Sequence, residues 1–97
     1  MAEVRFHPEA QAEYQDALAW YQARSRQAAD RFEAEAERVL GLITSNPGLF
    51  PRYDDEHRFV MLRRFPYSMV YRVLADGIYV IAVAHSRRKP NYWQGRA

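Results

Sequence analysis

A chain of 97 residues, of which 48% are hydrophobic and 14% aromatic, has enough apolar side chains for one folded domain, which we expect to span residues 1–97. The absence of cysteine excludes disulfides and cysteine-based zinc sites. No apolar stretch is long enough to span a membrane and no signal-peptide core is present, so we expect a cytoplasmic protein with no membrane contact. The net charge of +2 does not exclude nucleic acid as a partner, because the charge is unevenly distributed.

The first elements are a strand and a helix. Val4 and Phe6 alternate with Arg5, which predicts a short half-buried strand over residues 3–7. Pro8 suits the first turn of a helix because its missing N–H has no partner to lose there. Apolar residues at helical spacing then predict an amphipathic helix over residues 8–25.

A second amphipathic helix is predicted over residues 28–44, with Ser25 as the break between the helices or the cap of the second. Its apolar stripe includes Phe32, Ala36 and Val39, and the Asn46-Pro47-Gly48 sequence ends it. Two helices alone cannot hide both of their stripes, so they need a third surface to cover.

Three further strands can provide that surface. They are predicted over 58–65, 67–74 and 78–84, and the last is apolar on both faces, as a central strand would be. Asp76-Gly77 predicts a type I′ turn between the last two strands. The expected fold is therefore α+β, with an N-terminal strand, a helical hairpin and a three-stranded antiparallel meander.

Positive charge is concentrated in the second half of the chain. Residues 1–50 hold five arginines and eight acidic residues, whereas residues 51–97 hold eight arginines, one lysine and four acidic residues. Arginine offers a planar fork for phosphate or carboxylate and also stacks on flat rings. We therefore expect a basic face that contacts nucleic acid or an acidic protein partner.

His85 follows the last predicted strand and has two possible roles. It could act as a general acid or base, or it could be a strand-end histidine bonded to the backbone. Arg87, Arg88 and Lys89 come directly after it and could contact phosphates or an acidic partner. The three histidines show no metal-ligand spacing, so we expect no metal and no cofactor.

The aromatic pair Tyr92-Trp93 could stack on a base or close the open end of the core. An antiparallel meander could also bring the arginines of neighbouring strands to one edge or face. The residues expected to bind a target or partner are Arg63, Arg64, Arg72, Arg87, Arg88, Lys89, Tyr92 and Trp93.

Three stretches of the chain carry a family resemblance. They are Ala19-Trp20-Tyr21, then Arg63, Arg64, Pro66 and Tyr67, and finally Ala82, Val83, His85, Arg87, Arg88, Pro90, Tyr92 and Trp93. With the order of elements, they make nearly the whole chain resemble the RelE/ParE superfamily of toxins from type II toxin–antitoxin systems, also described as plasmid stabilisation proteins.

The resemblance implies a growth-inhibiting toxin that is neutralised by a cognate antitoxin, with operator DNA contacted only through that antitoxin. RelE-like members resemble ribosome-dependent mRNA endoribonucleases, whereas ParE-like members inhibit DNA gyrase and cleave nothing. Phe59, Met61 and Ser68 stand where RelE-like enzymes place basic residues, and they can neither activate an oxygen nor neutralise a phosphate. We therefore favour a ParE-like, non-enzymatic toxin that acts on gyrase. The alternative is an endoribonuclease acting on mRNA at the ribosome, with His85 and Arg87 as its catalytic pair.

Overall fold

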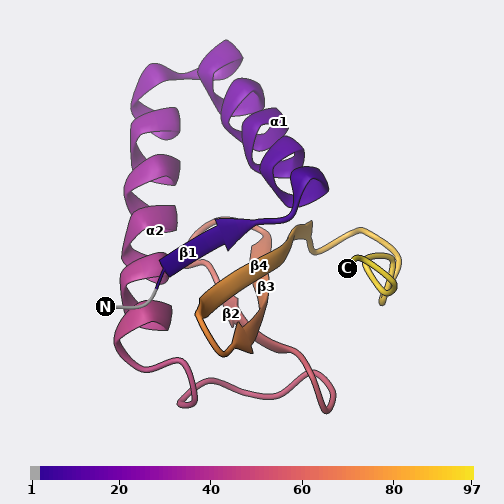
Figure 1. Ribbon diagram of the computed structural model, residues 1–97. Helices are drawn as coiled ribbons and strands as arrows, with labels where there is room; N and C mark the ends of the chain where they lie inside the picture. Colours follow the sequence, from indigo (N-terminus) through magenta and orange to yellow (C-terminus); the bar gives the residue numbers. More distant parts are fainter. Residues whose placement is uncertain (1–2) are drawn as a thin grey trace.

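The computed structural model describes residues 3–97, in which a mixed sheet packs against a helical hairpin (Figure 1). The elements are β1 (Glu3–Phe6), α1 (Pro8–Arg24), α2 (Arg26–Ser45), β2 (Arg58–Met61), β3 (Tyr67–Leu74) and β4 (Gly77–His85). The strand order is β1-β4-β3-β2, and only the β1–β4 pair is parallel within the described chain. The predicted α+β class, hairpin and antiparallel meander are confirmed, and β1 joins the meander as a fourth strand that makes the sheet mixed.

Each helix begins at a side-chain cap. The His7 Nδ1 atom accepts the N–H of Glu9 at 3.0 Å, so β1 ends one residue earlier than predicted and Pro8 opens α1. The Ser25 hydroxyl accepts the N–H of Ala28 at 3.2 Å, which starts α2 at Arg26. Ser25 is therefore the cap of the second helix, one of the two roles predicted for it.

One face of the sheet packs against both helices and forms the inner core. Phe32, Ala36 and Val39 of the predicted α2 stripe are buried there, and α1 contributes the small residue Ala17. β4 lies between β1 and β3, as its continuous apolar sequence predicted. The buried members of the inner core are Ala17, Phe32, Ala36, Val39, Ile43, Leu62, Met69, Tyr71 and Ile78.

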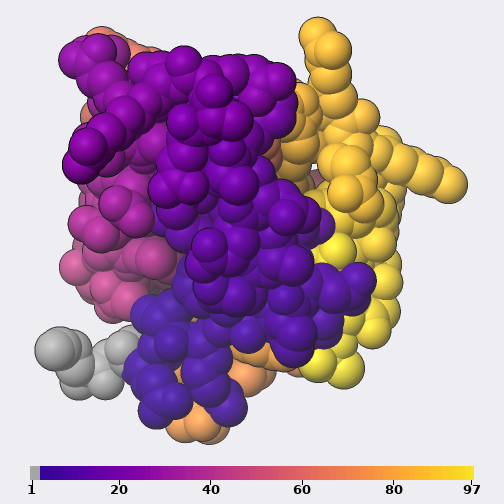
Figure 2. Space-filling model, turned by 90° about the horizontal axis from the view of Figure 1, so that it is seen from above, coloured from indigo at the N-terminus to yellow at the C-terminus, as the bar shows by residue number. Residues whose placement is uncertain are grey.

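The opposite face of the sheet is partly covered by residues 86–97, which we call the C-terminal segment. In Figure 1 this segment and α2 lie on opposite sides of the sheet, and Figure 2 shows it alongside α1. Trp93 buries its ring against β3 and β4. The resulting outer cluster has Val70, Ile81, Ala82 and Trp93 as its buried members.

A bulge in β4 increases the apolar area of this outer face. Val70 pairs with Ala82 and Tyr71 with Val80, so Ile81 is an additional residue on β4. Ile81 and Ala82 consequently both reach the outer cluster, although consecutive residues of a regular strand face opposite sides.

Two predicted local features are wrong. β2 ends at Met61 rather than at residue 65, because the Leu62 N–H donates to the Tyr67 carbonyl at 2.9 Å and closes the loop 62–66. The turn between β3 and β4 is not type I′. Its central residues are Ala75 and Asp76, and neither is among the residues with positive φ in the described chain.

Gly77 is required at the start of β4 for a different reason. Its φ is 153°, in the region that favours glycine. A Cβ atom at this position would collide with the backbone carbonyl of Glu3, the residue that pairs with Gly77 in β1. The glycine that was predicted for an Asp-Gly turn therefore allows β1 and β4 to approach closely enough to pair.

Candidate functional site

The start of β3 and the end of β4 meet at one end of the sheet. Tyr67 pairs with His85, and the Ser86 N–H donates to the Pro66 carbonyl at 2.8 Å. The two basic stretches of the chain therefore leave the sheet at the same end. We call this region the cationic sheet end, and its exposed members are Arg63, Arg64, Arg87, Arg88 and Lys89.

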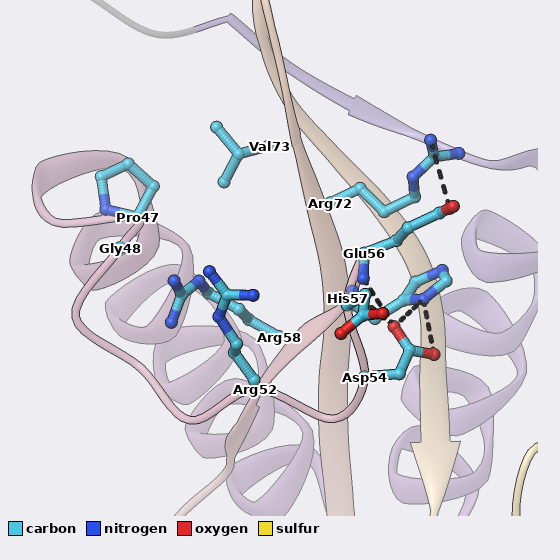
Figure 3. A pocket seen from close by; sticks show the side chains of 10 residues that line it. Pro47, Gly48, Arg52, Asp54, Glu56, His57, Arg58, Arg72 and Val73 are labelled. Atoms are coloured by element: carbon cyan, nitrogen blue, oxygen red, sulfur yellow. Dashed lines mark hydrogen bonds and ion pairs between the residues drawn. The ribbon is translucent and has the colours of Figure 1, made fainter.

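Arg72 is the predicted binding arginine that lies elsewhere. It pairs with Tyr79, five residues along β3 from Tyr67, which corresponds to about 17 Å of strand. Figure 3 shows its guanidinium group directed toward Glu56, at 3.6 Å, on the far side of a surface cleft from Arg52 and Arg58. Five of the six predicted cations thus lie on the segments that leave the sheet at one end, and the sixth lies elsewhere.

The cleft of Figure 3 includes an acidic turn that organises its loop. Asp54 accepts the N–H groups of Glu56 and His57, each at 2.8 Å, and the His57 ring at 2.8 Å. Burial acts to raise the pKa of Asp54, but hydrogen bonds from Gln94 and from the loop outweigh it and hold that pKa well below its usual range. Asp54 therefore stays ionised and connects this loop to the C-terminal segment through Gln94, at 3.0 Å.

Trp93 and Tyr92 are held within the fold. Trp93 is 3% exposed, and its ring lies 4.9 Å from Tyr53 and 4.7 Å from His57 between centroids. Of the two roles predicted for Trp93, stacking on a base or closing the core, its burial supports the second. Tyr92 is half-buried, and its hydroxyl donates to Glu13 at 2.6 Å while Arg88 stacks on its ring at 3.9 Å.

A groove lies on the outer face of the sheet beside the C-terminal segment. Met61, Ser68 and Ala84 form one row across three strands, because Met61 pairs with Ser68 and Ser68 with Ala84. Phe59 lies in the same groove, and Met61 is 68% exposed. We call this the outer groove. Its floor combines the apolar Phe59, Met61 and Ala84 with the hydroxyl of Ser68, and Arg88 and Lys89 line its rim.

His85 lies at the junction of the outer groove and the cationic sheet end. Its Nδ1 atom accepts the Arg87 N–H at 3.0 Å, so the neutral ring carries its proton on Nε2. The ring makes an edge contact with Tyr67 at 5.0 Å between centroids. His85 therefore has the backbone bond of a strand-end histidine and keeps Nε2 available beside the groove.

No sequence pattern predicts the role of Glu13, which lies beneath the C-terminal segment. This carboxylate on α1 accepts the Val83 N–H at 3.0 Å and also binds Tyr92 and Arg96. Burial alone would raise the pKa of Glu13. The hydrogen bonds from Arg96 and Tyr92 outweigh that effect, so the pKa of Glu13 lies below its ordinary value. Arg96 also donates to the Ile81 carbonyl at 3.0 Å, so this ion pair satisfies the edge of β4 beyond the end of β1.

Within residues 3–97, no group of three or more histidine, aspartate or glutamate side chains is placed to hold a metal ion. Neither helix of that range is long and apolar enough to cross a membrane.

The architecture is that of a small α+β domain in which a helical hairpin packs on a four-stranded sheet. A chain in the solved structure titled "Chromosomal ParDE TA system from P. aeruginosa" has a similar fold, with a TM-score of 0.62. The match covers 88% of this chain and 96% of that chain at 14% sequence identity, which establishes the fold alone. No curated protein sequence gives a significant match.

The family is established by sequence. The family model described as "ParE toxin of type II toxin-antitoxin system, parDE" matches residues 4–90, which is most of the chain. The chain belongs to the ParE toxin family of type II toxin–antitoxin systems. The predicted RelE/ParE superfamily membership and the ParE-like branch are both confirmed.

Proposed function

We propose that the protein inhibits growth by binding a macromolecular target, DNA gyrase, in the cytoplasm and that a cognate antitoxin neutralises it. Operator DNA would be contacted through the antitoxin alone. The main support is the chemistry of the outer groove, together with family membership. Phe59, Met61 and Ser68 line this groove and offer neither a general base nor a cation to a bound phosphate.

An apolar groove with a cationic rim is suited to binding a protein surface. Exposed apolar side chains contribute burial energy, while charges at the rim set orientation and association rate. Met61 and Phe59 would provide the apolar contact, and Arg88 and Lys89 the rim. This division resembles the core and rim of protein interfaces in general.

A gyrase supercoiling assay with the purified toxin tests the proposal. The wild-type chain should block supercoiling, and Met61→Glu should weaken inhibition by about tenfold or more because a charge would enter the apolar contact. The matched control is Val73→Glu, which also changes an exposed apolar residue of the sheet, near the opposite end of β3. Undiminished supercoiling at a large excess of the wild-type toxin would exclude gyrase as the target.

The second candidate function is an mRNA endoribonuclease, and the placement of His85 favours it. Its Nε2 atom is available beside the outer groove, and Arg87 is exposed next to it. This function predicts codon-phased cuts in translated mRNA that disappear in His85→Ala while the fold is retained. Equal cleavage by His85→Ala would exclude His85 as the catalytic group. A growth assay with and without the antitoxin distinguishes either toxin from an inactive antitoxin-binding protein.

A further inference from the structure

A cleft between α2 and the loop 62–66 brings four arginines together. Arg31 and Arg38 come from α2, and Arg63 and Arg64 come from the loop. The cleft encloses about 610 Å³, enough for several side chains. We call it the arginine cleft. The sequence had indicated only the two loop arginines, because Arg31 and Arg38 lie in the acidic half of the chain.

One carboxylate at the base of the cleft orders both of its walls. Glu35 binds Arg38 through two oxygens, each at 2.8 Å, and accepts the Arg63 N–H at 2.6 Å. The Glu35 side chain is 12% exposed. The Glu35 carboxylate therefore neutralises the charge of Arg38 and fixes the loop against α2. The backbone positions of the other three arginines are consequently fixed relative to one another.

The other three guanidinium groups of the cleft lie without a direct partner in the described chain. Among residues 3–97, the Arg31, Arg63 and Arg64 guanidinium groups have no hydrogen-bond acceptor and no ion-pair partner. All three side chains are exposed on one cleft. Like charges held close together repel, so a ligand that neutralises them gains more than it would from isolated surface arginines.

The backbone of the loop gives an independent indication of a binding role. Arg64 has φ of 67°, in the left-handed region that is unfavourable for a side chain with a Cβ atom, at a cost of about 1 kcal/mol. Glycine would adopt this conformation without that cost. An arginine here places a guanidinium group at the rim of the cleft at some expense to folding stability.

We propose that the arginine cleft binds the carboxylates of an acidic protein segment that also carries an apolar side chain. Arginine–carboxylate pairing already occurs within the cleft, where Arg38 binds Glu35. Ala28, Ala34 and the half-buried ring of Phe65 line the cleft with apolar surface, which suits a peptide side chain. A phosphate backbone would use the arginines but would leave this apolar surface without a partner. The inference does not depend on the target proposed above.

Fluorescence anisotropy with the purified full chain tests this site. The probe is a labelled peptide in which pairs of glutamates alternate with leucine, and the comparison peptide has glutamine in place of glutamate. Binding should be specific for the glutamate peptide and should weaken as salt is raised. Arg31→Gln and Arg64→Gly should each weaken binding about threefold, and the double variant about tenfold.

Arg64→Gly separates binding from folding. Glycine relieves the strained backbone, so thermal stability should be unchanged or higher while the affinity for the peptide falls. Arg52→Gln is the matched control, since it removes an exposed arginine from the cleft of Figure 3 and should leave affinity unchanged. Amide NMR shifts on titration should be largest at Ala28, Arg63 and Phe65.

Two outcomes would overturn the proposal. Equal weakening by Arg52→Gln would mean that the peptide responds only to net charge. Tighter binding of a single-stranded DNA oligonucleotide of matched charge, lost in Arg31→Gln and Arg64→Gly, would assign the cleft to nucleic acid. Loss of gyrase inhibition in a separate assay would leave the peptide result unaffected, so the two proposals fail independently.

Discussion

The two faces of the sheet are buried in different ways. The inner face lies under two helices and packs through side chains that are almost entirely hydrocarbon or aromatic. The outer face lies under the C-terminal segment, which has one large anchor, Trp93. That segment is held otherwise by polar contacts, of which the Glu13–Arg96 pair and the Asp54–Gln94 bond are the main ones.

The difference predicts two levels of stability. Apolar burial depends on area and tolerates small changes in geometry, so the inner core should unfold as one cooperative unit. The outer layer depends on a few directed hydrogen bonds and ion pairs, each of which is lost when one partner is removed. The C-terminal segment should therefore open locally at a lower free energy than the helices.

The largest expected effect is the loss of an aromatic side chain from the inner core. Phe32 is fully buried, and its ring centroid lies 5.2 Å from Tyr21 and 5.3 Å from Phe65. Phe32→Ala should lower the free energy of unfolding by about 4 kcal/mol, because it creates a cavity among packed rings. Denaturant unfolding followed by circular dichroism measures this.

The control for that variant is Trp20→Ala on α1. Trp20 is 50% exposed and contacts mainly Tyr21 and Arg24, so its removal should cost less than about 1 kcal/mol. Equal losses for the two variants would contradict the assignment of the inner core as the dominant source of stability.

The next largest effect tests the outer layer through its anchor. Trp93→Ala should release the C-terminal segment and expose Val70 and Ile81, at a cost of about 3 kcal/mol. Hydrogen exchange should become fast in residues 86–97, while α2 keeps most of its protection. Uniform loss of protection across both regions would mean that the two layers unfold together.

The inner face is also the part of the fold that the sequence predicts best. The α2 stripe at Phe32, Ala36 and Val39 repeats with the period of a helix, and periodicity is visible in any single sequence. Boundaries that depend on local chemistry were less predictable. The end of β2 and the turn at Ala75-Asp76 depend on loop hydrogen bonds and on the parallel partner β1, neither of which has a sequence pattern.

The residues of the candidate site were likewise only partly predictable from the sequence. That Arg63 and Arg87 lie on segments leaving the same end of the sheet could be anticipated from an antiparallel meander, but the separation of Arg72 depends on strand register. Arg31 lies far along the chain from Arg63 in the arginine cleft, and Glu13 lies far from Val83, whose N–H it accepts. Both residues belong to helices whose sequences have an ordinary amphipathic pattern. Contacts of that kind become visible only when the helices are placed on the sheet.

A smaller effect is expected from removing one charge beneath the C-terminal segment. Glu13→Gln keeps an acceptor for the Val83 N–H but breaks the ion pair with Arg96, whose side chain is 10% exposed. The loss should be about 2 kcal/mol, seen first as faster exchange in residues 86–97. Glu9→Gln is the matched control. Glu9 meets the same guanidinium group at 3.6 Å while largely exposed, so its loss should be below about 0.5 kcal/mol.

The smallest effect should appear on mild acidification. The folded-state pKa values of Glu13 and Asp54 lie below their ordinary values, so both carboxylates stabilise the outer layer above about pH 4. That stabilisation is lost as the pH falls further and the groups take up protons. In a Trp20→Phe background, Trp93 fluorescence should report exposure of its ring below about pH 4, before the helices unfold. Adding Glu13→Gln should weaken this pH dependence, because one of the two titrating groups is gone. A Trp93 signal that changes only together with helix content would show that acid does not open the outer layer separately.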